Sequence, residues 1–336
     1  MRQRFQSFWW GEALSPYEWL CLKSFADFGH AFDLYTFDPD IVVPSGIRVC
    51  DASEVVNPSE FFAPEGGVGK GSPPAFANLF RYKLLAQKGG WWVDTDVVCL
   101  ADTMPDRPEF VARLDDDVVG SAVMVFGPRH AAMIRCFELA RELGRSNRWA
   151  DAGPRLLTRV LKELDHMNRV HAASTCYPVL APDALDLLRP SKLGRMCARL
   201  GGSFFLCLWN AVLSQYGVRK SYLPPRGSML RHLVEQHRVE GWTGEYDEAG
   251  VEALLKAVAE QLEIDRRLAA ERDANRRLMA ERARLQDELR ERVAAGDELR
   301  TELDAVLSST SWRMTQPLRA IGRRVSRRQS TSRAAE

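Results

Sequence analysis

The sequence predicts an α/β protein with a parallel sheet, followed by one long charged helix and a basic tail. Three observations predict this organisation. Strand and helix patterns alternate over residues 1–245, residues 246–307 are charged and contain no proline, and residues 308–336 are Ser/Thr-rich and basic. Alternating strands and helices are typical of a parallel sheet. We therefore divide the chain into a mixed domain (1–245), a helix (246–307) and a tail (308–336).

Composition narrows the class of protein. Hydrophobic residues make up 46% of the 336, enough for a substantial core, and a net charge of +1 gives no case for nucleic acid as a partner. The seven cysteines are scattered and include no C-x-x-C pair, which indicates reduced thiols in a cytosolic protein. No apolar run reaches the roughly 18 residues that span a bilayer, and the N-terminal apolar run is too short for a secretory signal. These features predict a cytoplasmic protein.

The first β-α-β unit occupies about 35 residues. "FQSFWW", residues 5–10, has the pattern of a strand, and "HAFDLYTF", residues 30–37, has that of a second strand. Between them, Ser15 is expected to cap a helix that has Pro16 at its first position and Glu18 in a capping box. Ligands of parallel sheets collect beyond the carboxyl ends of the strands, where Trp9 lies.

The second unit leads into a pair of carboxylates. After a Gly/Pro loop, an apolar stripe predicts a helix that stops at Gly89–Gly90, with Asn78 and Arg81 on a different face. We interpret "WWVDTDVVCL", residues 91–100, as one buried strand. If that strand stays extended, its period of two directs Asp94 and Asp96 to the same side.

Two carboxylates at the end of a buried strand can hold a divalent cation. Oxygen ligands suit Mg²⁺ or Mn²⁺, and the cation makes burial of the charges tolerable. A cation held there can bind a diphosphate and stabilise the negative charge that develops when the diphosphate leaves. The alternative is that one aspartate caps a loop and the other is solvated at the strand end.

The segment "FANLFRYKLLAQKGGWWVDTDVVCL", residues 76–100, resembles the core of the DXD-type sugar transferases grouped as glycosyltransferase family 32. This family includes Golgi mannosyltransferases and bacterial capsule and surface-polysaccharide enzymes. The segments "FWWGEALSPYEWLCLKSF", "DAGPRLLTRVL", "SFFLCLWNAVL" and "PPRGSML" extend the resemblance over about residues 5–232. It implies a GT-A-like fold, a UDP- or GDP-linked sugar donor, a saccharide or lipid-linked acceptor, Mn²⁺ or Mg²⁺, and retention of the anomeric configuration.

The resemblance also implies roles for individual residues. Asp96 would ligate the metal, and Asp94 would contact the ribose or the donor sugar close to the metal. Arg81 would reach the donor sugar or its phosphate, and Trp9 would stack on the base. Many relatives have aspartate at the position of Asn78, which faces the donor hydroxyls; an asparagine can still hydrogen-bond them.

Near the end of the predicted catalytic domain the chain departs from the family. Relatives often carry His-Leu-Trp-Asn where this sequence has Cys207-Leu208-Trp209-Asn210. A thiolate is a soft ligand that matches Mg²⁺ and Mn²⁺ poorly. We therefore expect Asn210, and not Cys207, to supply an oxygen to the metal.

Two other functions fit parts of the sequence. "WWVDTDVV" also matches the haloacid-dehalogenase pattern, in which Asp94 would be the nucleophile of a phosphohydrolase and Asp96 its acid/base. That fold needs a further acidic pair downstream, which we do not find. The third possibility is a non-catalytic scaffold derived from a transferase. Elsewhere, His166 and His171 flank a polar turn, and we expect them at the surface.

The C-terminal third is predicted to be helical, then basic. From Leu278 to Leu307 apolar residues recur with the period of a straight α-helix, interrupted by Arg282 and Gly296. Residues 251–307 could self-associate as a coiled coil. The tail resembles short tails of bacterial surface-polysaccharide transferases, and over residues 311–333 its arginines beside apolar residues suit an anionic membrane surface. It would then hold the protein peripherally at the inner face of the cytoplasmic membrane; the alternative is a disordered basic tail.

Overall fold

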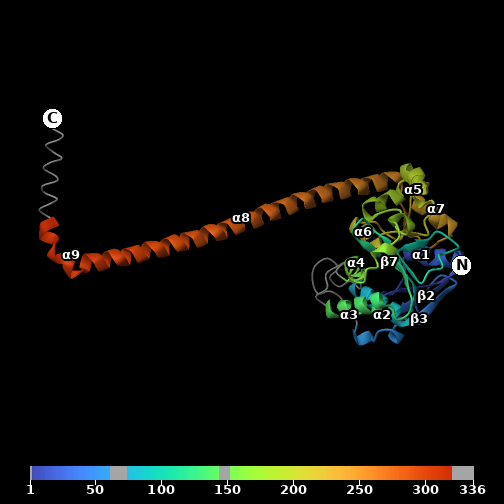
Figure 1. Cartoon of the computed structure of the whole chain (residues 1–336). Coiled ribbons are helices and arrows are strands. Elements are labelled where there is room, and N and C mark those ends of the chain that lie inside the picture. Colours follow the sequence, from blue (N-terminus) through green and yellow to red (C-terminus); the bar gives the residue numbers. More distant parts are fainter. Residues whose placement is uncertain (1, 61–73, 144–151, 320–336) are drawn as a thin grey trace. The chain divides into compact units, whose positions relative to one another are not determined.

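The computed structural model describes residues 2–60, 74–143 and 152–319. The chain divides into two compact units, Met1–Val258 and Ala259–Glu336 (Figure 1). Part of the Gly/Pro loop before residue 74 and most of the predicted membrane segment, from residue 320 onward, lie outside the described residues.

A six-stranded sheet forms the centre of the first unit, in the order β3-β2-β1-β4-β7-β6. Strands β1 to β4 run parallel, whereas β7 is antiparallel to both β4 and β6. The predicted α/β class is confirmed, with one antiparallel strand added to the parallel sheet. The strands are β1 (Arg4–Phe8), β2 (Ala31–Thr36), β3 (Ile47–Asp51), β4 (Gly90–Val93), β6 (Glu109–Arg113) and β7 (Val119–Phe126).

Helices cover both faces of this sheet, because successive strand residues point to opposite sides. Trp92 packs with α2 (Pro74–Lys88), α3 (Ala131–Leu143) and α4 (Pro154–Glu163) in one core cluster. Its neighbour Trp91 packs on the other face with α1 (Pro16–Asp27). The capping box predicted at the start of α1 is confirmed: the Ser15 side chain accepts a backbone N–H, and Glu18 accepts the N–H of Ser15.

The predicted strand over residues 91–100 is wrong in one respect, because the chain turns in its middle. Strand β4 ends at Val93 and β5 (Val97–Cys99) follows after a turn closed by a hydrogen bond from the Val97 N–H to the Asp94 carbonyl oxygen (3.1 Å). Polar Asp and Thr residues favour such turns. Strand β5 leaves the main sheet and pairs with β8 (Phe205–Cys207), more than 100 residues later in the sequence. Asp94 and Asp96 therefore flank a turn and do not share one extended strand.

A third core cluster lies among η6 (Ala181–Leu188) and α5 (Leu193–Leu200), which precede β8, the elements that follow β8, and parts of α1 and β5. The first turns of α8 (Glu248–Ser308) contribute Val251 and Val258 to it. The remaining elements of this region are η7 (Pro190–Lys192), α6 (Asn210–Gln215), α7 (Met229–Gln236), β9 (Tyr222–Leu223) and β10 (Gly244–Glu245).

The predicted long helix is confirmed as α8, 61 residues in one piece (orange to red in Figure 1). From Leu262 onward its large apolar side chains are exposed in this single chain. A short helix, α9 (Thr310–Met314), follows. Within the described residues, no helix has the length and apolarity that crossing a bilayer would require.

Candidate functional site

A cavity of about 600 Å³ opens at the carboxyl ends of β1 and β4. The two strands are parallel neighbours, with Phe5 opposite Trp91 and Gln6 opposite Trp92, so the residues that follow them meet at one edge. All six residues that the sequence assigned to the site line this cavity: Trp9, Asn78, Arg81, Asp94, Asp96 and Asn210. Their common location follows from the topology; their individual roles remain predictions.

Arg81 and Asp94 form the inner wall of the cavity. The turn at Gly89–Gly90 folds β4 back along α2, and a Cβ at Gly89 would lie 2.5 Å from the Pro128 nitrogen, so only glycine fits. The buried Arg81 guanidinium then forms an ion pair with Asp94 Oδ1, which also accepts from Trp92 Nε1 at 2.8 Å. Two donors thereby hold Asp94 Oδ1 in place.

Asp96 is held by the segment that follows β8. Its Oδ2 accepts the backbone N–H of Asn210 at 3.0 Å, and its carbonyl oxygen accepts that of Leu208 at 2.8 Å. Trp209 between them is left-handed, with φ 58°, which is unfavourable for a residue with a side chain. Such strain tends to be kept at functional sites. Here it directs the Asn210 N–H to Asp96.

Glu18 and Lys220 are site residues that sequence analysis missed. The Glu18 side chain is only 2% exposed, and its Oε1 accepts from the Asn210 side-chain amide nitrogen at 2.7 Å and from the Lys220 ammonium. This contact turns the Asn210 oxygen away from Glu18, and that oxygen is buried with no hydrogen-bond partner in the described part of the chain. The only sequence signal was that Glu18 belongs to the capping box, which gives it a purely local role.

The charges of the lining favour a divalent cation. Three carboxylates (Glu18, Asp94, Asp96) face two cations (Arg81, Lys220), so the lining is net negative by one charge when all are ionised. Burial, and secondarily the charge of Asp94, raise the pKa of Asp96 to about 6. A cation beside Asp96 would relieve both effects and would reverse the sign of the lining, which an anionic diphosphate requires.

The available donor atoms fit Mn²⁺ or Mg²⁺. Asp96 and the unpaired oxygen of Asn210 are hard oxygen ligands, as these ions prefer. Burial, and secondarily Asp96, raise the pKa of the Cys207 thiol well above its usual value, which disfavours the thiolate. Sulfur also matches these hard ions poorly, so oxygen atoms are the suitable ligands in this cavity.

Further buried polar atoms of the lining have no hydrogen-bond partner among the residues that the structure describes. Besides Asn210, these are Ser7 Oγ, Trp9 Nε1 and two guanidinium nitrogens of Arg81. Buried polar groups are almost always hydrogen-bonded. A polar ligand in the cavity would satisfy them. The Trp9 ring lies against Gly11, where an added Cβ would come within 3.3 Å of the indole nitrogen, and so has a fixed position at the rim.

No protein-family model and no curated protein sequence matches the chain. Among solved structures it is similar to PaToxG glycosyltransferase, at 12% identity over 71% of this chain and 85% of that one, with a TM-score of 0.37. It is also similar to the apo-form glycosyltransferase GlyE of Streptococcus pneumoniae, at 9% identity over 78% of this chain and 64% of GlyE, with a TM-score of 0.35. These likenesses are distant, so function has to be inferred from the cavity itself.

Proposed function

We propose that this protein is a metal-dependent, retaining hexosyltransferase that takes a sugar from a nucleotide-sugar donor. One observation carries the proposal: Asp94, Asp96 and Asn210, whose side-chain oxygen has no hydrogen-bond partner among the described residues, line one cavity of about 600 Å³. This volume falls within the range of roughly 300–1,000 Å³ that is usual for small-molecule sites. The tryptophan at the rim, Trp9, adds a flat apolar surface for a base.

Different residues are proposed to bind the metal and the sugar donor. Asp96 and Asn210 would hold Mn²⁺ or Mg²⁺, with Asp94 close by. When bound, the cation supplies positive charge to the diphosphate as it leaves. Arg81 forms an ion pair with Asp94 at the cavity wall, where Asp94 can accept hydrogen bonds from ribose or sugar hydroxyls. Asn78 on α2 offers a further amide to the donor.

The acceptor is proposed to be a saccharide or a lipid-linked saccharide of a bacterial surface polysaccharide. We also propose that the protein is a member of the DXD-type glycosyltransferase family 32. The C-terminal region is proposed to act in two ways. Residues 251–307 could self-associate through the apolar side chains of α8 that are exposed from Leu262 onward, whereas Val251 and Val258 already pack in the core. The basic segment 311–333 could bind the anionic inner leaflet of the cytoplasmic membrane, although only residues up to 319 are described.

The phosphohydrolase alternative receives less support from the geometry. Asp94 Oδ1, which would be the nucleophile, already accepts from Arg81 and Trp92. Such donors stabilise the carboxylate and make it a poorer nucleophile. Lys220, the one lysine of the lining, pairs with Glu18 and not with either aspartate.

A donor screen tests the proposal. UDP- and GDP-sugars are incubated with the full chain and Mn²⁺ or Mg²⁺, with and without a chelator, and release of nucleoside diphosphate is measured. We expect release from at least one donor, which stops when the metal is removed. Release of phosphate from simple phosphomonoesters instead would favour the hydrolase, and no turnover of any donor would favour the non-catalytic scaffold.

A further inference from the structure

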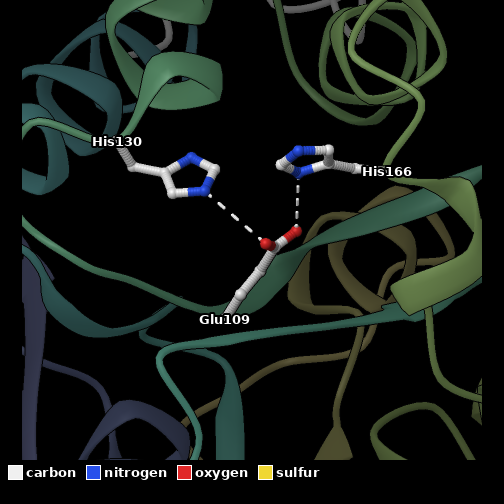
Figure 2. A group of neighbouring side chains, drawn as sticks. All are labelled: Glu109, His130 and His166. Carbon is white, nitrogen blue, oxygen red and sulfur yellow. Dashed lines mark hydrogen bonds and ion pairs between the residues drawn. The ribbon is translucent and has the colours of Figure 1, made fainter.

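A second group of metal-ligating side chains, drawn in Figure 2, is not part of the cavity lining. Glu109 begins β6, His130 directly precedes α3, and His166 directly precedes the short 3₁₀ helix η4 (Met167–Arg169). One ligand atom from each of these residues lies within 4.8 Å of the others. Sequence analysis expected His166 at the surface, but its side chain is largely covered where it meets Glu109.

This group is separate from the donor cavity. Glu109 pairs across the sheet with Phe126, and Phe126 pairs with Gly90, the first residue of β4. The cavity opens after Val93, at the other end of β4. Glu109, His130 and His166 therefore lie near the ends of the strands opposite to those at which the cavity opens.

The two spacings between Glu109 and the histidines are close to those around a tetrahedral ion. Glu109 Oε1 lies 3.1 Å from His166 Nδ1, and Glu109 Oε2 lies 3.5 Å from His130 Nε2. With zinc bonds of roughly 2.0–2.1 Å, neighbouring ligands of a tetrahedral site are about 3.3–3.4 Å apart. The two imidazoles face the two oxygens of one carboxylate, and the three ligand atoms lie within 4.8 Å of one another, so they have to draw closer to share one ion.

We propose that Glu109, His130 and His166 form a Zn²⁺ site. Two imidazoles and one carboxylate suit Zn²⁺ better than Mg²⁺ or Mn²⁺, and a water molecule can complete the tetrahedron. The ion would tie the start of β6 to the segments before α3 and η4. The ion would support the sheet at the ends of the strands opposite the cavity.

Two existing contacts would have to change when zinc binds. Arg169 Nη1 lies 2.9 Å from Glu109 Oε2, and the Ala132 N–H donates to His130 Nδ1 at 3.2 Å. A metal on Nε2 requires the ring proton on Nδ1, so the contact with Ala132 is given up. Arg169 competes with zinc for the same carboxylate, but its side chain is 57% exposed and can move into water.

If zinc and Arg169 compete for Glu109, variants of Arg169 and of His166 should change the zinc affinity in opposite directions. If the group is only a hydrogen-bonded network, replacing Arg169 removes a partner of Glu109 and has no effect on zinc. If it is a zinc site, Arg169→Ala removes a competitor and tightens zinc binding. His166→Gln removes a ligand, and we expect it to weaken binding at least tenfold.

The experiment is a Zn²⁺ titration of metal-stripped full-length protein by calorimetry, with thermal unfolding in parallel. Asp96→Asn is present throughout, so that the donor cavity does not contribute. The matched control is His232→Gln, which removes an exposed histidine of α7. We expect one equivalent of zinc that raises the unfolding temperature, is weakened in His166→Gln, is tightened in Arg169→Ala and is unchanged in the control.

Several results would overturn the proposal. These are the absence of zinc binding, equal binding by His166→Gln and the control, or no tightening in Arg169→Ala. Loss of the zinc equivalent in Cys197→Ser would also overturn it, because Cys197 is an exposed thiol elsewhere in the fold. Should His166→Gln fail to fold, the Arg169→Ala measurement decides alone.

Discussion

Replacing Asp96 by asparagine should stabilise the metal-free protein while removing its response to Mn²⁺. The pKa of Asp96 is raised from 3.8 to about 6, first by burial and then by Asp94. The folded state therefore binds the proton more tightly than the unfolded state, and at pH 7 the ionised carboxylate costs stability. Asparagine has the same shape, carries no charge, and keeps an oxygen that can accept the Asn210 N–H.

The size of the change in the free energy of unfolding follows from the raised pKa of Asp96. One unit corresponds to about 1.4 kcal/mol, so Asp96→Asn should raise the free energy of unfolding by on the order of 2–3 kcal/mol at pH 7 without metal. The gain should shrink as the pH falls through 6 and vanish below about 4, where the carboxyl is protonated in both states. With Mn²⁺ the order should reverse, because only the wild-type carboxylate holds the ion firmly.

Urea unfolding at pH 7 and pH 4, with chelator and then with Mn²⁺, measures these differences. Asp116→Asn is the matched control, since Asp116 is exposed on the loop between β6 and β7. The reasoning fails if Asp96→Asn destabilises the metal-free protein at pH 7. It fails equally if Mn²⁺ stabilises the variant as much as the wild type.

Four further outcomes are expected. Mn²⁺ affinity, followed by electron paramagnetic resonance, should fall up to about tenfold per pH unit below pH 6, because protons compete for Asp96; a flat profile would exclude Asp96 as a ligand. Glu18→Gln should weaken Mn²⁺ binding by about 10–100-fold because the Asn210 amide loses its charged acceptor. The control Ser15→Ala weakens the same helix cap and should leave binding unchanged; equal losses would mean a purely structural role. Deletion of residues 308–336 should spare donor hydrolysis and reduce co-sedimentation with anionic vesicles at low salt, and equal sedimentation of both proteins would refute the anchor. An α-linked donor should give an α-linked product by NMR, and a β-linked product would contradict retention.

Several elements could be predicted from the sequence because local interactions decide them. Ser15 and Glu18 cap α1 through contacts within one helical turn, so their spacing alone identifies the start of that helix. The long helix α8 contains no proline and carries its own pairs of opposite charge at helical spacing, such as Arg267 with Glu263. It could also be predicted from the sequence that Trp9 and Asp94 lie close together, since residues that follow neighbouring parallel strands meet at the same ends of those strands.

Contacts between distant segments decided the rest. The strand expected over residues 91–100 breaks at Asp94–Asp96 because β5 pairs with β8, a partner that no local pattern reveals. Glu18 was predicted as a helix cap, yet Asn210 and Lys220 approach it from some 200 positions away and make it part of the site.

The sequence by itself thus determined the class of fold, the capped start of α1, the uninterrupted helix α8 and the kinds of residue that line the cavity. Only the tertiary structure decided which atoms face one another. It turned the Asn210 oxygen away from Glu18 and brought His166 onto Glu109, 57 positions earlier. The physical reason is that propensity and capping act within a few residues, whereas a binding site is made by packing side chains from segments that the chain itself keeps far apart.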